Sequence, residues 1–393
     1  MNFNILANML TLVSEPQPGT GYTRISVRVG VGSSHEPAEL RGISHFLEHM
    51  LFRGTKRHPT PDEQGKAAEL LGSVMEAHTS DLATVYSISV RPECLRQALD
   101  LLRDMFETPL LADIELERNI VQEEILESLD DEGRLVDALK LVATKLYPSD
   151  PRGLPIYGSP ESVSRISEDD LRSWLERHYV GSNMICIITG EFDDADARYL
   201  VAESLGKLKA GTPTPVQGVQ ESQDVQPLFV ENTASQTSIC VAWRVNTPYA
   251  RHAAAFSILA SLLGGRMFKS IVQDMGLCYH TSMNIFAARD CVSFVLNAEC
   301  APENSDDVTQ ALLSVPSKPF SRGDLERHVS TTSFELVRSL ATPDGLAAAF
   351  LDEIDFQAPR ARSEDLYHVT EAHIEEVRQL IDPDNASVVV VGP

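Results

Sequence analysis

The chain has 393 residues, of which 43% are hydrophobic and 23% charged, an ordinary composition for a globular protein with room for two or three domains. Its formal net charge of -24 at pH 7 argues against nucleic acid and against an anionic membrane surface as partners. The acidic excess permits a cationic ligand, but solubility explains it more simply.

The first thirteen residues lack the basic start and the small-residue cleavage site of a secretory signal. We expect them to form two strands around a turn at Asn8. No apolar run is long enough to predict a membrane span. The six cysteines are scattered without a C-x-x-C pair, which favours reduced thiols over a disulfide framework or a cysteine-based metal site. Together these features predict a cytoplasmic protein.

A half-buried strand is expected over residues 21–33, where Ile25, Val27, Val29 and Val31 alternate with other residues. A mostly polar turn follows this strand. The glycines near its end fit a turn, because no phosphate-loop pattern accompanies them.

The next stretch, Gly42–Thr55, contains His45, Glu48 and His49 in the spacing H-x-x-E-H. Residues three and four apart share one face of a helix, so the two imidazoles and the carboxylate point the same way. Such imidazoles can hold a zinc ion, and the glutamate can take a proton from a water on that ion. A lone histidine on an apolar helix is more often a core residue. A histidine pair flanking a glutamate is instead a zinc-peptidase signature, which needs a third ligand elsewhere.

A helix over residues 61–72 is expected to begin at Thr60, with Pro61 at its first position. A strand pair is predicted over residues 73–80 and 83–91, and an amphipathic helix over 92–107.

A further acidic helix is predicted over residues 111–130, where apolar residues recur at helical spacing. Three of its glutamates fit a solvated face: Glu115, Glu123 and Glu127. Glu117 and Glu124 are seven residues apart and share a face, so one of them could donate an oxygen to zinc while the other orients a ligand.

The remaining pattern predicts an N-terminal domain over residues 1–210, a linker over 211–227 rich in Gly, Pro and Gln, and a C-terminal domain over 228–393. The order of strands and helices is similar in both halves. It favours two α+β domains, each a mostly antiparallel sheet with helices packed on one face. In the second half we expect separate helices over 250–263 and 266–275, broken at the glycine pair between them.

The stretches HFLEHMLFRGT and LERNIVQEEILES resemble the M16 zinc metallopeptidases, specifically the half-size subfamily similar to the mitochondrial processing peptidase β subunit. Further similar stretches are GSSHEP, MEAHTSDLATVYS, GLPIYGSPESV and GLCYHTS. The resemblance implies that the two domains form half of a clamshell, which closes into a peptide-degrading chamber.

The same resemblance implies one zinc ion per chain, with His45, His49 and Glu124 as ligands. It implies that Glu48 is the general base and that Glu117 assists catalysis by orienting a ligand.

For substrate binding, the resemblance points to Ala77, on an edge strand to which the peptide adds as a further strand, and to Tyr279. The family pairs this tyrosine with an arginine seven residues earlier, where this chain has Val272. A valine side chain cannot donate a hydrogen bond. Arg266 is too far along the same segment to be the expected substitute.

These features predict a zinc endopeptidase subunit that cleaves small or unfolded peptides. Its expected partner is a homologous M16 subunit that supplies the Arg/Tyr pair in a heterodimer, with a homodimer as the alternative arrangement. A ribosomally made precursor peptide is one candidate substrate. The competing hypothesis is a non-catalytic structural or binding subunit of an M16-like complex.

Overall fold

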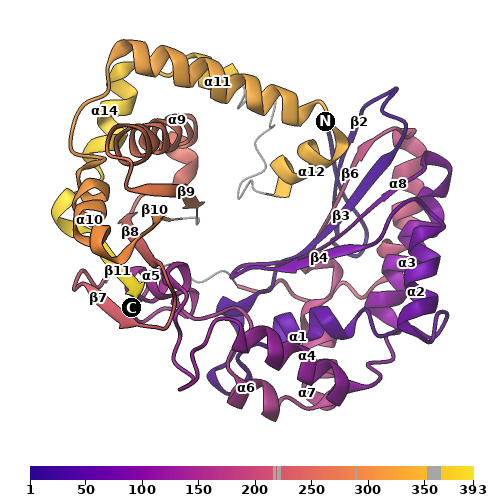
Figure 1. Ribbon diagram of the computed structural model, residues 1–393. Coiled ribbons are helices and arrows are strands. Elements are labelled where there is room, and N and C mark those ends of the chain that lie inside the picture. The colour runs from indigo at the N-terminus through magenta and orange to yellow at the C-terminus, as the bar shows by residue number, and fades with distance from the viewer. Residues whose placement is uncertain (216–217, 219–222, 288–289, 352–363) are drawn as a thin grey trace. The chain divides into compact units, whose positions relative to one another are not determined.

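The computed structural model describes residues 1–215, 218, 223–287, 290–351 and 364–393. The chain divides into two compact units (Figure 1). Unit 1 comprises Met1–Glu127, Pro155–Val216 and Ser339–Glu353. Unit 2 comprises Ser128–Leu154, Gln217–Arg338 and Ile354–Pro393. Each unit is an α+β structure built on one sheet, as the sequence predicted.

Unit 1 contains a six-stranded sheet in the order β1-β2-β6-β3-β5-β4. Its strands are β1 (Asn2–Ile5), β2 (Thr11–Pro16), β3 (Thr23–Val29), β4 (Glu76–Thr79), β5 (Thr84–Val90) and β6 (Met184–Gly190). The β2–β6 pair is parallel and the other named pairs are antiparallel. The short strand β4 therefore lies at one edge.

Helices cover one face of this sheet (Figure 1). They are α1 (Ile43–Met50), α2 (Pro61–Glu69), α3 (Leu95–Glu107), α4 (Ile114–Leu126), α6 (Pro160–Arg165), α7 (Glu168–His178) and α8 (Asp194–Glu203). The expected start of α2 is confirmed, because Thr60 and Glu63 form a reciprocal capping box. The opposite face, near β6 and β3, is packed by α12 (Pro343–Leu351). Strand β3 is consequently buried on both sides at its centre, rather than on one side as its alternation suggested.

Unit 2 contains a five-stranded sheet in the order β7-β11-β8-β10-β9, with only the β7–β11 pair parallel among these named strands. Its strands are β7 (Leu228–Glu231), β8 (Thr237–Val245), β9 (Cys278–Ala287), β10 (Val292–Cys300) and β11 (Ser387–Gly392). Its helices include α5 (Ala138–Leu146), α9 (Tyr249–Met267), α10 (Ser305–Ser314), α11 (Arg322–Leu340) and α14 (Glu371–Gln379). The helix α5 packs on β8 and β11, where Leu141 and Val142 join a buried cluster.

The two units do not follow the continuous boundaries expected at residues 210 and 228. Residues 128–154, which include α5, belong to unit 2, and residues 339–353, which include α12, belong to unit 1. An amphipathic pattern shows that a helix needs an apolar surface, but it does not show which sheet provides that surface. Part of the expected linker at 211–227 lies outside the described residues.

The expected break at Gly264 and Gly265 is wrong. The helix α9 runs through both glycines and continues into a π-helical segment, η7 (Phe268–Asp274). A Cβ on Gly265 would lie 2.6 Å from Cε1 of His328, so this glycine allows the His328 side chain of α11 to pack closely against α9.

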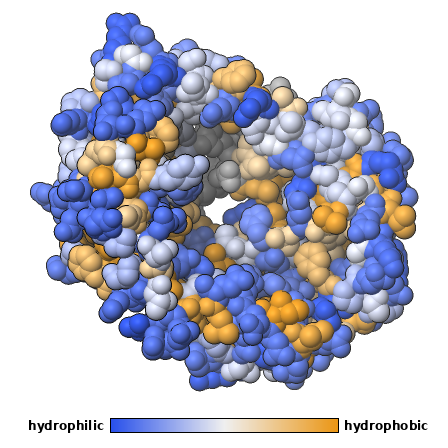
Figure 2. Space-filling view, in the orientation of Figure 1, coloured by the Kyte–Doolittle hydropathy of each residue, from blue (hydrophilic) through white to orange (hydrophobic). Residues whose placement is uncertain are grey.

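The segment Tyr249–Asp274 is long and apolar enough to cross a membrane by length and composition, contrary to the expectation that no run would be. In the fold its buried apolar residues, among them Phe256, Leu259 and Leu263, belong to the core of unit 2, whereas Phe268 is 46% exposed. On the face that Figure 2 draws, hydrophobic residues are scattered among a majority of hydrophilic ones.

Candidate metal centre

The helix α1 carries the H-x-x-E-H motif, and its start is closely defined. Gly42 precedes the helix with φ of 92°, and a Cβ there would lie 2.4 Å from the carbonyl oxygen of Tyr157. The buried carboxylate of Glu36 accepts hydrogen bonds from the backbone N–H groups of Gly42 (2.7 Å) and Ser44 (2.8 Å). Two otherwise unpaired donors at the helix N-terminus are thereby satisfied.

The helix α4 packs against α1 and presents the two glutamates that sequence spacing singled out. Arg118 holds this helix in place by donating to the carbonyl oxygens of Val163 and Ile166, while its guanidinium lies 5.3 Å from the ring centre of Phe46 on α1. One face of α4 is therefore held against α1, the helix that carries the H-x-x-E-H motif.

His45, His49 and Glu124 come together, with one ligand atom from each lying within 4.8 Å of the other two. Nε2 of His45 lies 3.6 Å from Oε1 of Glu124, and Nε2 of His49 lies 3.6 Å from Oε2. Ligands bound tetrahedrally at the usual zinc distances are about 3.3 Å apart, so these separations need little closing. Two imidazole nitrogens and a carboxylate oxygen are also a donor set that zinc prefers. The residues present thus fit a zinc ion.

Glu117 contacts the second histidine from the other side. Its Oε1 lies 2.9 Å from Nδ1 of His49, and its Oε2 lies 3.5 Å from Arg53. Arg53 also donates to Asp113 across 2.9 Å. This chain of contacts assigns the proton of His49 to Nδ1 and leaves Nε2 free to bind a metal.

The surroundings of the two histidines shift their pKa values in opposite directions. Burial, reinforced by the neighbouring His49, lowers the pKa of His45 to about 3, so this imidazole is neutral. Burial also acts to lower the pKa of His49, but the hydrogen bond that His49 donates to Glu117 and the charges of nearby carboxylates outweigh it and raise that pKa. Nδ1 of His45 is buried without a hydrogen-bond partner within the described part of the chain.

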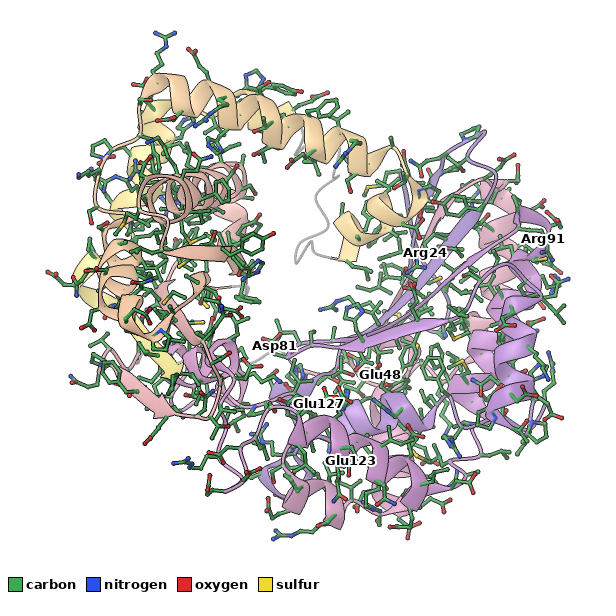
Figure 3. The ribbon with its side chains drawn as sticks, in the orientation of Figure 1. Arg24, Glu48, Asp81, Arg91, Glu123 and Glu127 are labelled. Carbon is green, nitrogen blue, oxygen red and sulfur yellow. The ribbon has the colours of Figure 1, made fainter. Side chains whose placement is uncertain are left out.

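Glu48, which Figure 3 labels, stands between His45 and His49 in the sequence of α1. Its side chain is buried, with only 9% of the residue exposed. Thr79, on β4, donates a hydrogen bond of 2.5 Å to its Oε2. Burial raises the pKa of Glu48 above its ordinary value, and the hydrogen bond from Thr79 partly offsets that rise. A carboxylate with a raised pKa is suited to accept a proton near neutral pH.

Ala77 lies on β4, directly opposite Tyr86 of β5. Among the named strands β4 pairs only with β5, so its outer backbone groups are available for another strand. This placement matches the edge position expected for Ala77.

The residues of interest in unit 2 have different surroundings. Tyr279, at the start of β9, is 97% exposed, and Val272 is half-buried in η7. Arg266 donates to the carbonyl oxygens of Val315, Lys318 and Pro319, and its guanidinium stacks 3.7 Å from the ring centre of Phe320. The donors of Arg266 are thus engaged within unit 2.

Sequence reasoning did not identify Glu36, Arg53 or Thr79. Thr79 could have been found, because it follows Ala77 by two residues and strand alternation puts both on one face. Arg53 lies three residues beyond the end of α1, so helical spacing did not indicate it. Glu36 gave no signal, because its contacts depend on how the turn before α1 folds.

Comparison with known proteins shows the family to which the chain belongs. The family model described as insulinase, peptidase family M16, matches residues 11–158, and the model described as peptidase M16 inactive domain matches residues 165–318. A Mycobacterium leprae protein named as an uncharacterised zinc protease is 31% identical over 318 residues, covering 78% of this chain and 70% of the relative. A Bacillus subtilis protein named in the same way is 30% identical over 280 residues, covering 69% and 67%.

Solved structures share the fold. A Helicobacter pylori protease superimposes with a TM-score of 0.90 at 21% identity, covering 100% of this chain and 99% of the other. An M16-like peptidase of Alicyclobacillus acidocaldarius gives 0.85 at 21% identity, covering 100% and 98%. With both halves matched in order and a relative more than 30% identical, this chain belongs to the M16 peptidase family.

Proposed function

We propose that this chain is a zinc-dependent endopeptidase subunit that hydrolyses small or unfolded peptides. The observation that carries the proposal is the grouping of His45, His49 and Glu124 around one point, with the buried carboxylate of Glu48 on the same helix. A purely structural role would not need these four groups together.

In this mechanism His45, His49 and Glu124 would hold a zinc ion, which would supply Lewis-acid polarisation of a water molecule and of the peptide carbonyl. Oε1 of Glu48 accepts a proton from the attacking water. The water oxygen bonds to the carbonyl carbon, and Glu48 then passes the proton to the leaving nitrogen as the C–N bond breaks. The products are a carboxylic acid and an amine, and transfer of the acid's proton to the amine gives a carboxylate and an ammonium group at neutral pH.

The free edge of β4 is the proposed place for the substrate. A peptide that adds there as a further strand would be held mainly by backbone hydrogen bonds. Such binding selects an extended, accessible chain over a folded one, and gives little side-chain selectivity.

The second half of the chain supports a partner subunit. Val272 occupies the position where the family resemblance expects arginine, and the donors of Arg266 are engaged by three carbonyl groups. The match of residues 165–318 to a model described as an inactive domain also supports the need for a partner subunit. We propose that a homologous subunit with an arginine seven residues before its tyrosine completes the site, and a homodimer is the alternative.

The test is to assay zinc-loaded chain, alone and with such a homologue from the same source, on a library of unstructured peptides. Cleavage that requires both chains and disappears with Glu48→Gln is the expected result. Full cleavage by the isolated chain would refute the heterodimer. A complex that binds zinc but cleaves nothing would favour the non-catalytic alternative, and cleavage of a single precursor peptide would favour a maturation role.

A further inference from the structure

Thr79 connects the edge strand β4 to the carboxylate of Glu48. Its Oγ1 lies 2.5 Å from Oε2 of Glu48, although the two residues are 31 positions apart in the chain. A hydroxyl that donates to a carboxylate at this distance makes a strong, charge-assisted hydrogen bond.

The direction of this hydrogen bond is set by its surroundings. Oγ1 of Thr84, on β5, lies 3.5 Å from Oγ1 of Thr79 and donates its own proton to the carbonyl oxygen of Val31 across 3.0 Å. An ionised carboxylate can only accept a hydrogen bond, and Oε2 of Glu48 lies closer to Oγ1 of Thr79 (2.5 Å) than Oγ1 of Thr84 does (3.5 Å), so Thr79 donates to Glu48. Within the described residues, Oε1 of Glu48 has no hydrogen-bond partner.

We propose that Thr79 is a positioning residue that holds Oε2 of Glu48 and leaves Oε1 as the single proton-accepting oxygen. This inference rests on the proposed peptidase function for its catalytic consequence. Without the hydroxyl, the glutamate side chain would be free to rotate away from the water or toward the ligand histidines on its own helix. Correct orientation of a general base is a geometric requirement before its basicity matters.

The location of Thr79 adds a link to the substrate. Thr79 and Ala77 share one face of β4, the strand whose outer edge is free. A peptide paired along that edge would fix the same backbone segment that carries the Thr79 hydroxyl, so substrate binding and orientation of the base depend on one strand.

The experiment compares Thr79→Val, which keeps the shape but removes the hydroxyl, with Thr79→Ser, which keeps the hydroxyl. For the zinc-loaded enzyme with its partner, we expect Thr79→Val to lower kcat about 10- to 100-fold with KM within about threefold of the wild type. Thr79→Ser should restore kcat to within about threefold. Equal losses in both variants, or a loss confined to KM, would overturn the proposal.

A second measurement does not depend on activity. In crystal structures of the two metal-free variants, the Glu48 carboxylate should leave residue 79 in Thr79→Val and stay hydrogen-bonded to it in Thr79→Ser. An unchanged carboxylate in both variants would overturn the positioning role. If the wild type cleaves no peptide but the carboxylate moves only in Thr79→Val, the peptidase proposal fails while the positioning role stands.

Discussion

Nδ1 of His49 lies 2.9 Å from Oε1 of Glu117, and the other oxygen of that carboxylate lies 3.5 Å from Arg53. The carboxylate thus contacts a ligand histidine and a permanently charged guanidinium at once. Since Nδ1 donates to Glu117, the lone pair of His49 is on Nε2, the atom that faces Glu124.

Glu117→Ala should weaken zinc binding about 10- to 100-fold, because His49 loses the group that sets its tautomer and ring orientation. The measurement is competition with a chelating dye at fixed pH. Glu127→Ala, an exposed position one residue past the same helix, is the control and should leave the affinity unchanged. Equal affinities for the wild type and Glu117→Ala would remove Glu117 from the metal site.

Glu124→Gln should reduce bound zinc from about one ion per chain to a small fraction of that value after dialysis. The amide keeps the side-chain shape but replaces an anionic ligand with a neutral one that zinc binds poorly. Glu123→Gln, one residue earlier and exposed, serves as the matched control and should retain its zinc (Figure 3). Elemental analysis of the purified proteins reads out both variants, and retention of zinc by Glu124→Gln would contradict the ligand assignment.

Glu36 should make the metal-free protein less stable as pH rises. Burial raises its pKa to about 7, from an ordinary value of 4.5, so the folded state favours the protonated form. The stabilisation is complete below pH 4.5 and is lost as the pH rises towards 7, by about 3 kcal/mol in total. Glu36→Gln lacks this titration, so its stability relative to the wild type should increase by that amount across this range.

Urea denaturation of both proteins in EDTA, at a series of pH values from 4.5 to 7, measures this difference. The exposed Glu39→Gln is the control and should parallel the wild type. If the free energies of unfolding of Glu36→Gln and the wild type change with pH in the same way, the two backbone N–H groups keep Glu36 ionised in the folded protein.

Arg266→Met should destabilise the protein by about 2–4 kcal/mol, because three carbonyl groups lose a charged donor. Its zinc content should not change. Arg322→Met, which removes an exposed arginine paired with Glu326, should leave the free energy of unfolding nearly unchanged, because an exposed ion pair is screened by solvent. Unfolding curves separate the two variants. An Arg266→Met protein of normal stability with reduced kcat would instead make Arg266 the substitute for the missing arginine.

Much of the metal centre could be predicted because helical periodicity converts sequence spacing into geometry. Residues 45, 48 and 49 lie on one helix, and residues 117 and 124 lie two turns apart on another. The meeting of the two helices could not be derived from spacing, and only the family resemblance paired Glu124 with the histidines.

The contacts that were missed depend on segments meeting in three dimensions. Glu36, in the turn before α1, accepts hydrogen bonds from backbone N–H groups at the start of that helix. Thr79 on β4 donates a hydrogen bond to Glu48 on α1. The sheets on which α5 and α12 pack could not be predicted for the same reason, since an apolar helix face is compatible with either sheet.

The exchange of α5 and α12 between the two halves of the sequence affects how this protein can be divided. Cleavage of the chain between residues 211 and 227 would yield two fragments that stay associated. The N-terminal fragment contains α5, which belongs to unit 2, and the C-terminal fragment contains α12, which belongs to unit 1. If either half were expressed alone, its sheet would lack one of the helices that cover it, and one of its own helices would lack the sheet on which it packs. Split versions of this chain should therefore be coexpressed.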